Sequence, residues 1–598
     1  MPCPYRPGGG VKNEDRRAWR RDALVCALVF LAVAALVLST AGDYGVTTDE
    51  PIYIGQGQRI AGWLRGAAMS FAHGDLVSPF RREILDKAWY AGKDEQPPLV
   101  KVLSGVFSGL QSTSGMRAPG ALLLAAACAA LCWFCTRPFG DTLKVTPQGH
   151  PNGRPWGREA GIGAALALAL MPRVFAHAHY AALDVPVASL VLVTAFALWK
   201  LGEDGRWRWA VAAGVLSGLA LLAKLNAGLL VPVLLIWSAI WQRKAMLKKA
   251  VALCVIGPVV FAAGWPWLWH DSLHRLAEYL RFHLSHYPVD VYYLGHTYHY
   301  APWHYTLVLT AVTLPLGILL LVVIGASNAI GAVRKEKDEK AALLVVCAAS
   351  YLLVSSLPGA PKYNGVRLFM PAFPFLAGLA GMGFARLCSF LARRLARAGI
   401  ARAWLVFAAG AVIFGSAAAA VAAMHPYQLA YYSALVGGMR GARRVGLETI
   451  YWGGPYLDAL PRLNERAALR GHPEGGPQGR PSGTLKAPFG VLRGRRAATI
   501  YVIPRGAISY LRLYQDAGML RRDLQFTARG ADAKQTREAL RRSDLVVFQC
   551  AQSEFDEIAR ALYRRGKPLW QVEMNVVPLL MAFDARAAER LIGGGSRS

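Results

Sequence analysis

Long apolar runs alternate with short polar segments over most of the first 424 residues. Runs of about 17–25 residues are long enough to cross a bilayer as helices. The pattern predicts an all-α polytopic membrane protein with about 11 transmembrane helices, within a range of 11 to 13, over residues 22–424. The runs lie near residues 22–41, 118–136, 159–175, 183–200, 209–223, 227–241, 250–268, 303–324, 341–357, 367–388 and 403–422.

The connecting segments differ in charge in a regular way. Lys and Arg gather in residues 1–21 and then in every second loop, at 137–158, 200–208, 242–249, 334–340 and 386–402. Because positively charged loops stay in the cytoplasm, residues 1–21 are expected to form a cytoplasmic basic N-terminus. The first apolar run is long and no small-residue cleavage site follows it, which favours a retained helix over a signal peptide. We therefore expect a multi-pass protein of the cell (inner) membrane.

Residues 43–98 form the first external loop, with helical patterns at 52–64 and 81–90. The short apolar stretch 99–112 is interpreted as a re-entrant or interfacial helix, with a true crossing as the alternative.

The hydrophobic pattern changes after residue 424. Strand-like runs at 497–503 and 544–549 flank a helical pattern at 532–542, which predicts an extracytoplasmic (periplasmic or extracellular) α/β domain over residues 425–598. The segment 469–495, rich in Gly, Pro and Arg, is expected to be a mobile loop, and 593–598 a disordered tail.

Composition supports the membrane assignment and explains the charge. The chain is 54% hydrophobic and 17% charged, with a formal net charge of +30. The cations sit mostly in clusters between apolar runs, where they set orientation and contact anionic lipid, so we expect no nucleic-acid partner. No metal-ligand spacing, disulfide framework or nucleotide-binding loop is present, and no cofactor is assigned, although a divalent metal is left open.

Asp49 and Glu50 follow the first apolar run and are the first candidates for chemistry. A carboxylate at the edge of a bilayer can have its pKa adjusted by partial desolvation and can act as a general base. A helix cap ahead of Pro51 is the alternative, and both roles can hold at once.

Several cations and polar groups on the external side are candidates for binding an anionic substrate. Lys101 follows Gln96 and two prolines, while Lys362 and Arg367 stand where the positive-inside rule disfavours cations. A phosphate would explain them. For Lys101 the alternative is a lysine that reaches toward the interface from a helix end.

Two further segments carry ionisable or aromatic side chains. His177 and His179 are candidates for substrate binding, with a surface or hydrogen-bonded role as the alternative. They precede Asp184, which begins an apolar run and is a candidate acidic group, with a helix cap as the alternative. The His- and Tyr-rich loop at 292–304 contains Tyr293 and His299, which suit sugar binding or an interfacial aromatic belt equally well. The spacing of these histidines is poor for a metal, and none is predicted.

Taken in order, these motifs resemble those of membrane glycosyltransferases of GT-C fold, the family of protein O-mannosyltransferases and bacterial aminoarabinose (lipid A) transferases. Residues 48–53 look like its first acidic motif, and Gln96–Lys101 is similar to a His-Pro-Pro-Leu-x-Lys pattern, with Gln96 in place of His. The likeness continues through residues 176–186, 222–226, 367–374 and 425–453.

The resemblance implies an inverting transfer of a hexose or pentose from a polyprenyl-phosphate donor to a lipid, glycan or protein acceptor on the outer side. It implies that Asp49 is the general base, with Glu50 beside it, and that Asp184 is a second acidic group. It makes Lys101, with Lys362 or Arg367, the candidates for the carrier phosphate. The alternatives are a lipid-linked glycan transporter or flippase and a non-catalytic envelope scaffold.

Overall fold

The computed structural model describes residues 9–90, 96–107, 113–136, 157–285, 287–395, 400–465 and 498–593. The chain divides into two compact units, one of residues 1–44 and 52–442 and the other of residues 45–51 and 443–598. The predicted loop 469–495, most of 137–158 and the tail after Gly593 lie outside the described residues.

The first unit is a bundle in which every predicted apolar run is helical. Among the described residues, eight helices are long and apolar enough to cross a membrane, and Trp207–Ala223 and Leu225–Trp241 are shorter apolar helices. The predicted multi-pass helical fold is confirmed. Its long elements are α1 (Gly9–Thr40), α5 (Thr113–Thr136), α6 (Arg158–Ala169), α8 (Asp184–Asp204), α9 (Trp207–Ala223), α10 (Leu230–Trp241), α11 (Met246–Val251), η5 (Ala252–Ile256), α12 (Gly257–Ala263), α15 (Leu316–Glu336), α16 (Glu339–Ser356), α17 (Phe373–Arg394) and α18 (Arg402–Ala423).

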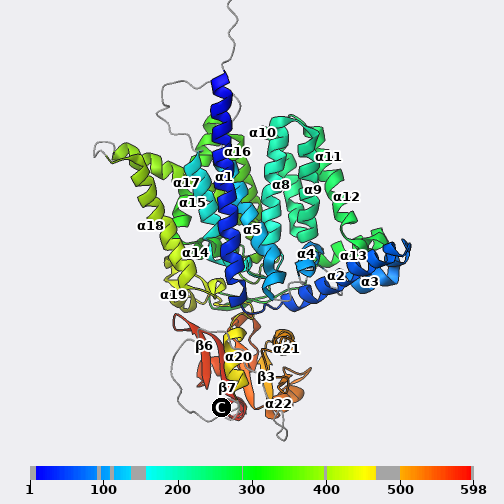
Figure 1. The fold of residues 1–598 in the computed structure, drawn as a ribbon. Coiled ribbons are helices and arrows are strands. Elements are labelled where there is room, and N and C mark those ends of the chain that lie inside the picture. The colour runs from blue at the N-terminus through cyan, green and yellow to red at the C-terminus, as the bar shows by residue number, and fades with distance from the viewer. Residues whose placement is uncertain are drawn as a thin grey trace, which may run out of the picture. The chain divides into compact units, whose positions relative to one another are not determined.

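The loops alternate between the two ends of the bundle. The connections α8–α9, α10–α11 and α15–α16 lie at the end where α1 begins (Figure 1). At the other end lie α2 (Glu50–Ala72), α3 (Arg82–Trp89), α4 (Leu99–Phe107), α13 (Ser272–Leu284) and α14 (Tyr305–Thr313). This alternation agrees with the charge pattern, and the cytoplasmic side of the first end stays a prediction.

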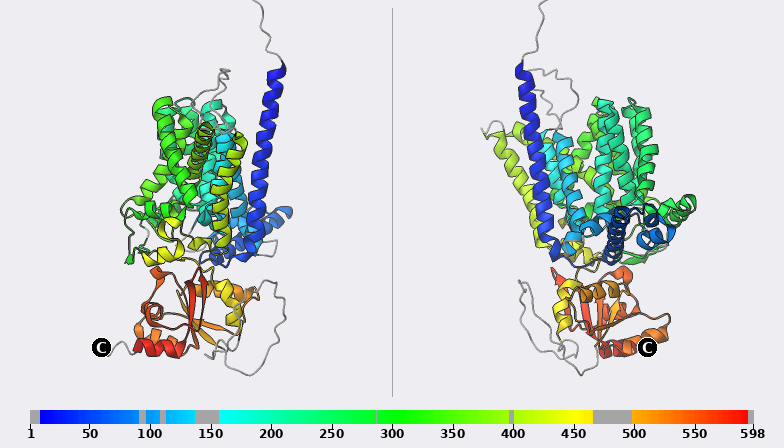
Figure 2. Two further views of the ribbon diagram at one scale, coloured as in Figure 1. Left: turned by 90° about the vertical axis from the view of Figure 1, so that its left-hand side faces the viewer. Right: turned by 45° about the vertical axis from the view of Figure 1, so that its right-hand side comes forward.

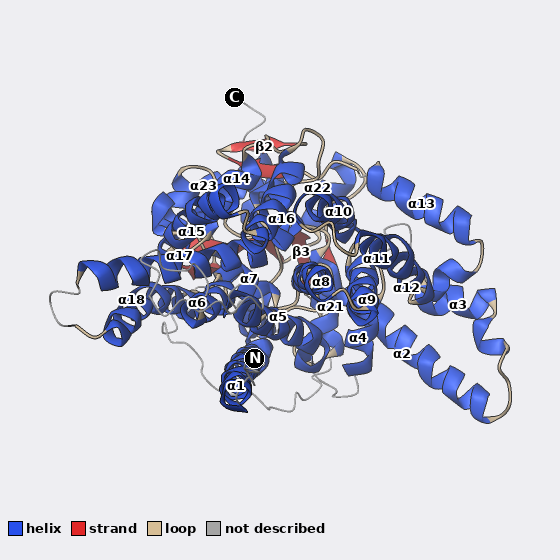
Figure 3. Ribbon diagram, turned by 90° about the horizontal axis from the view of Figure 1, so that it is seen from above, coloured by secondary structure: helices blue, strands red, loops and turns tan. Residues whose placement is uncertain are grey.

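Helix α8 occupies a central position. It packs against α5, α9 and α10, as the view along the bundle shows (Figure 3), whereas α1 runs along the outside (Figure 2). The predicted run 303–324 is broken between α14 and α15 at Pro315, because proline cannot donate a helical hydrogen bond. The stretch 99–112 contains α4, and residues 108–112 lie outside the described residues.

The second unit contains a five-stranded mixed sheet of strand order β4-β3-β5-β7-β6. Strand β3 pairs in parallel with β4 and β5, and β7 is antiparallel to β5 and β6. Strands β3 and β5 are almost wholly buried, as their continuous apolar sequences require. The elements are α19 (Gly438–Arg444, spanning the division between the units), α20 (Tyr456–Asn464), β3 (Thr499–Ile503), α21 (Ala507–Asp516), β4 (Gln525–Thr527), α22 (Ala533–Arg541), β5 (Leu545–Gln549), α23 (Glu557–Arg565), β6 (Trp570–Met574), β7 (Val577–Asp584) and α24 (Ala585–Gly593).

The predicted α/β architecture of the C-terminal region is therefore confirmed, but the unit differs from the predicted range in two respects. Residues 425–442 pack with the helical bundle, where Ser433 donates its backbone N–H to Val312 O at 2.8 Å. The short segment 45–51, near the other end of the chain, is part of the second unit.

Candidate functional site

Asp184 is the centre of a buried charged cluster in the helical unit. Its side chain is fully buried, and Lys224 Nζ donates to its Oδ1 at 2.7 Å. Arg367 Nε lies 3.4 Å from Asp184 Oδ2, and His177 Nδ1 lies 3.6 Å from the same oxygen. A buried carboxylate is stable only when it is paired, and here two cations approach it from different parts of the chain.

Four short structural features bring this cluster together. His177 ends α7 (Pro172–His177), Asp184 begins α8, Lys224 lies at the turn before η4 (Leu225–Leu229), and Arg367 begins η7 (Arg367–Ala372). The N-cap position of α8 is Leu183, and no side chain caps this helix. The alternative interpretation of Asp184 as a helix cap is therefore wrong, because its carboxylate binds cations instead.

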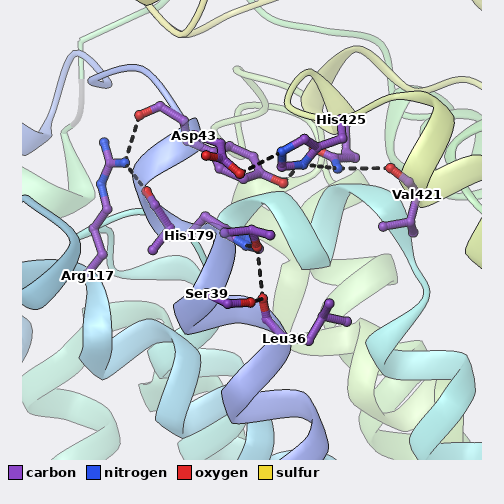
Figure 4. Close-up of polar contacts among 11 residues, drawn as sticks. Leu36, Ser39, Asp43, Arg117, His179, Val421 and His425 are labelled. Atoms are coloured by element: carbon purple, nitrogen blue, oxygen red, sulfur yellow. Dashed lines mark hydrogen bonds and ion pairs between the residues drawn. The ribbon is translucent and has the colours of Figure 1, made fainter. Parts of the chain in front are cut away.

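His179 belongs to a different network, although it is only two residues from His177. Its Nε2 lies 2.8 Å from Thr40 Oγ1 (Figure 4). Its Nδ1 lies 2.7 Å from Phe175 O, and the centre of its ring lies 4.1 Å from that of Tyr44, on which it stacks. The two histidines thus do not form a joint site. Across the part of the chain that the structure describes, no group of three or more His, Cys, Asp or Glu could hold a metal ion.

The network around His179 fixes the C-terminal end of α1. Arg117 on α5 donates to Ala41 O at 2.7 Å and to Tyr44 O at 2.8 Å. Asp43 Oδ2 lies 3.0 Å from His425 Nε2, and the Tyr44 hydroxyl donates to Gln428 Oε1 at 2.7 Å (Figure 4). These contacts join three distant parts of the chain just before the segment that carries Asp49.

Lys101 is 1% exposed and is held on α4. Its Nζ donates to Gln96 O at 2.5 Å and lies 5.7 Å from the centre of the Tyr53 ring on α2. The two helices touch at Gly57 and Gly105, where a Cβ on Gly105 would lie 2.1 Å from Gly57 O. Only glycine permits this close backbone approach, which sets the position of Lys101.

A cavity of about 450 Å³ opens among loops of the same unit. Lys362 lies on its wall, and its Nζ donates to Leu357 O at 2.8 Å and to Ala360 O at 3.1 Å. Burial lowers the pKa of Lys362 below that of an exposed lysine. The lining includes Lys362, His283, His299, Tyr287, Tyr300 and Tyr363.

Lys362 and His299 are the predicted binding residues that line this cavity, and two others, Gln96 and Arg367, lie near its lining residues. His283 Nε2 lies 3.4 Å from Gln96 Nε2, and the guanidinium of Arg367 lies 6.0 Å from the Tyr363 ring centre. Tyr293 is not among the lining residues. Its side chain is buried, and its hydroxyl lies 2.8 Å from His304 Nδ1.

Asp49 and Glu50 lie in the second unit, at the start of α2. Thr47 N–H donates to Glu50 Oε2 at 2.9 Å, and Glu50 N–H donates to Thr47 Oγ1 at 3.2 Å. This reciprocal pair is a capping box. The predicted cap is thus present, formed by Thr47 and Glu50, while Asp49 between them is half-buried.

Sequence reasoning missed Lys224, Arg173 and Arg117 as candidate functional residues. Arg173 is 2% exposed, donates to Tyr431 O at 3.3 Å and lies 4.6 Å from the centre of the Tyr432 ring. All three are cations at the end of the bundle where the positive-inside rule disfavours them. The sequence argument that selected Lys362 and Arg367, a cation where the positive-inside rule disfavours one, therefore applies to these three residues as well.

Known structures resemble the chain only weakly. ArnT from Cupriavidus metallidurans is 16% identical, with 94% of this chain and 98% of that chain covered and a TM-score of 0.48. The oligosaccharyltransferase of Archaeoglobus fulgidus is 12% identical, with 88% and 69% covered and a TM-score of 0.45. At TM-scores below 0.5 these likenesses carry no weight for function. No curated protein matches the sequence.

A family model matches a central part of the chain. Residues 153–270 match dolichyl-phosphate-mannose-protein mannosyltransferase, and this range contains His177, Asp184 and Lys224. The match agrees with the resemblance that the order of the motifs indicates. Over these residues the chain is similar to the dolichyl-phosphate-mannose-protein mannosyltransferases, and its predicted resemblance to the GT-C glycosyltransferases is confirmed.

Proposed function

We propose that the protein is an inverting glycosyltransferase that moves a hexose or pentose from a polyprenyl-phosphate donor to a lipid, glycan or protein acceptor. The carrying observation is the buried cluster of Asp184, His177 and Lys224, which lies within the residues that match the mannosyltransferase family. Buried ionisable groups at the ends of membrane helices mark functional sites more often than structural ones. The family's description supports a lipid phosphate as the sugar carrier.

Asp49 is the general base in this proposal. The carboxylate of Glu50 is fully buried and accepts a hydrogen bond from the Thr47 N–H, so its role is to cap the start of the helix. Asp49 is half-buried, and of the two carboxylates it is better placed to reach an acceptor hydroxyl. As the new glycosidic bond forms at the anomeric carbon, Asp49 takes the acceptor proton and the carrier phosphate leaves with the electrons of the broken bond.

The leaving phosphate needs positive charge, which Lys362, Lys101 and Arg367 can supply. Lys362 lies on the wall of the external cavity, whose volume of about 450 Å³ falls within the usual range for small-molecule sites. Cations fixed beforehand around a developing phosphate dianion stabilise it more than mobile water does. Because the carrier bond is already activated, no nucleotide is required.

The protein would act at the outer face of the cell membrane, with its N-terminus in the cytoplasm. The basic loops that share one end of the bundle with the start of α1 support this orientation.

Sugar transfer by the purified full-length protein tests the proposal. Radiolabelled polyprenyl-phosphate sugars, one with a hexose and one with a pentose, are offered with lipid, glycan and peptide acceptors. Wild type and Asp49→Asn are compared, with Asp516→Asn, an exposed acid at the end of α21, as the matched control. Loss of a general base lowers the rate by about 10²–10⁴-fold, so we expect Asp49→Asn to lose transfer while Asp516→Asn keeps it.

Two results would contradict the proposal. Full transfer by Asp49→Asn would place the base elsewhere, and Asp184 would be examined next. Binding of the lipid-linked sugar by wild type without transfer from either donor would favour a transporter or a non-catalytic envelope protein.

A further inference from the structure

The segment that carries Asp49 is built into the core of the C-terminal unit. Val46 is 4% exposed and packs in the same buried cluster as Tyr510, Tyr514 and Val502, which lie on α21 and β3. A segment at the other end of the sequence thus supplies an apolar side chain to this core. Its backbone is consequently tied to the α/β unit and not only to the transmembrane helix before it.

One hydrogen bond anchors this segment. The backbone N–H of Val46 donates to the hydroxyl oxygen of Tyr514 at 2.7 Å, and the bond is buried. Tyr514 is 3% exposed, so water does not compete readily for its hydroxyl. The residue is held by the packing of α21 and therefore presents the oxygen from a fixed position.

Close backbone packing holds the same segment from a second direction. A Cβ on Gly45 would lie 2.2 Å from Gly454 O, and one on Gly453 would lie 2.9 Å from Val46 O. Real Cβ atoms do not approach oxygen so closely, so both positions accept only glycine without a shift of the backbone. Two independent contacts thus fix the backbone at residues 45 and 46.

The fixed backbone leads directly to the two carboxylates. Thr47 follows Val46 and forms the capping box with Glu50, so each residue from Gly45 to Thr47 has a defined anchor. Asp49 lies inside this box. Its direction is therefore set by α21 and by residues 453–454 of the C-terminal unit.

We propose that Tyr514 is a positioning residue for the general base Asp49, an inference that rests on the proposed glycosyltransferase activity. Tyr514 itself does not touch the reacting atoms. Its hydroxyl holds the Val46 amide, which keeps Asp49 in the orientation that proton abstraction requires. A base must be held within a fraction of an ångström of its working position, and small displacements slow the reaction.

The test is Tyr514→Phe, which removes only the hydroxyl and keeps the ring in the core. Tyr501→Phe is the matched control, because Tyr501 lies on β3 of the same unit, is equally buried, and its hydroxyl has no hydrogen-bond partner among the described residues. Two measurements are made on the full-length protein. Hydrogen–deuterium exchange reports the protection of residues 45–51, and sugar transfer gives kcat and the KM for the lipid-linked donor.

We expect Tyr514→Phe to increase exchange at residues 45–51 and to lower kcat by about two- to tenfold, the range that one neutral hydrogen bond supports, with KM for the donor unchanged. Tyr501→Phe should match wild type in both measurements. Gly45→Ala, which forces the backbone away from Gly454, should change both in the same direction as Tyr514→Phe.

The proposal fails if Tyr514→Phe leaves exchange at residues 45–51 unchanged, or if exchange rises while kcat stays at the wild-type value. A fall in kcat shared equally by Tyr501→Phe would also overturn it, since the effect would then be general loosening of the unit. If wild type transfers no sugar, the proposed function fails, but the exchange data still decide whether Tyr514 anchors the segment.

Discussion

The two units of the molecule bind fully or partly buried carboxylates in different ways. In the helical unit the fully buried Asp184 is bound by Lys224 at 2.7 Å, and Asp86 on the short helix α3, whose side chain is 35% exposed, receives two bonds from Arg275 at 2.5 and 2.9 Å. In the C-terminal unit, backbone N–H groups donate hydrogen bonds to the carboxylates instead. Glu50 accepts the Thr47 N–H at 2.9 Å, and Asp556 accepts the Ala559 N–H at 2.8 Å.

The difference follows from what each fold can offer. Helices that span a membrane use nearly all of their backbone donors internally, so a buried acid depends on cations brought from other segments. The helix starts that lie in the second unit, at residues 47–50 and 556–559, have free N–H groups, which bind acids locally. Carboxylates of the first kind tie distant segments together, and those of the second kind fix single turns.

Glu554 of the C-terminal unit shows a third solution. Burial, with a smaller contribution from the charge of Glu448, raises the pKa of Glu554 from 4.5 to about 8. At neutral pH this acid is therefore kept neutral by its own proton.

The largest expected effect is at Asp184. Asp184→Asn leaves Lys224 and Arg367 near a neutral amide in a buried place, and breaking a buried pair in this way costs about 3–5 kcal/mol. Asp204→Asn is the control at the other end of α8, where the acid pairs with Arg208 at the surface. Thermal unfolding in detergent should show a large fall in Tm for the first variant and no measurable change for the second. Equal effects would contradict the difference drawn between buried and exposed pairs.

The next effect concerns pH and the C-terminal unit. The folded state keeps the Glu554 proton up to about pH 8, whereas the unfolded chain releases it near pH 4.5. The stabilisation is thus complete below pH 4.5 and is lost as pH rises to about 8, by up to about 5 kcal/mol.

Melting curves between pH 4.5 and 9 measure this effect. Glu554→Gln should flatten the decline in Tm, because its amide stays neutral at every pH, while Glu557→Gln, an exposed acid in the first turn of α23, should keep the wild-type slope. A wild-type Tm that rises over this range, or a slope unchanged in Glu554→Gln, would show that Glu554 is not the controlling group.

The smallest effect is at the capping box. Thr47→Ala removes the hydroxyl that accepts the Glu50 N–H, which should cost about 1 kcal/mol, as for other N-caps. Glu50→Gln should likewise lower Tm slightly and leave sugar transfer largely intact, because Asp49 is the proposed base. If Glu50→Gln abolishes transfer while Tm hardly changes, the roles of the two carboxylates are reversed.

The sequence predicts the helical bundle well because the relevant signal is local. Each apolar run is mostly helical, although the runs 159–175 and 303–324 are each divided between two helices, and the strands at 499–503 and 545–549 coincide with predicted runs. Even the interruption at Pro315 follows from a single residue. Hydrophobic burial depends on short stretches of chain, so one sequence suffices to detect it.

The candidate site is less accessible from sequence because its contacts are non-local. Lys224 is 40 positions from Asp184, and Val46 is 468 positions from Tyr514. The hydrophobic periodicity of the sequence contains no information about contacts between residues so far apart in the chain. The sequence therefore identifies Asp184 and Asp49 as candidates, but their partners emerge only when the folded chain brings them together.

The place of Val46 in the C-terminal core also has a consequence for biogenesis. Residues 45–51 leave the ribosome about 400 residues before the rest of their unit, which begins at Arg443. At about 5–20 residues per second, this delay is roughly 20–80 s. During that time the Val46 side chain and backbone N–H are without the buried partners that they have in the folded unit, so residues 45–51 reach their final conformation only after the C-terminal unit has been made.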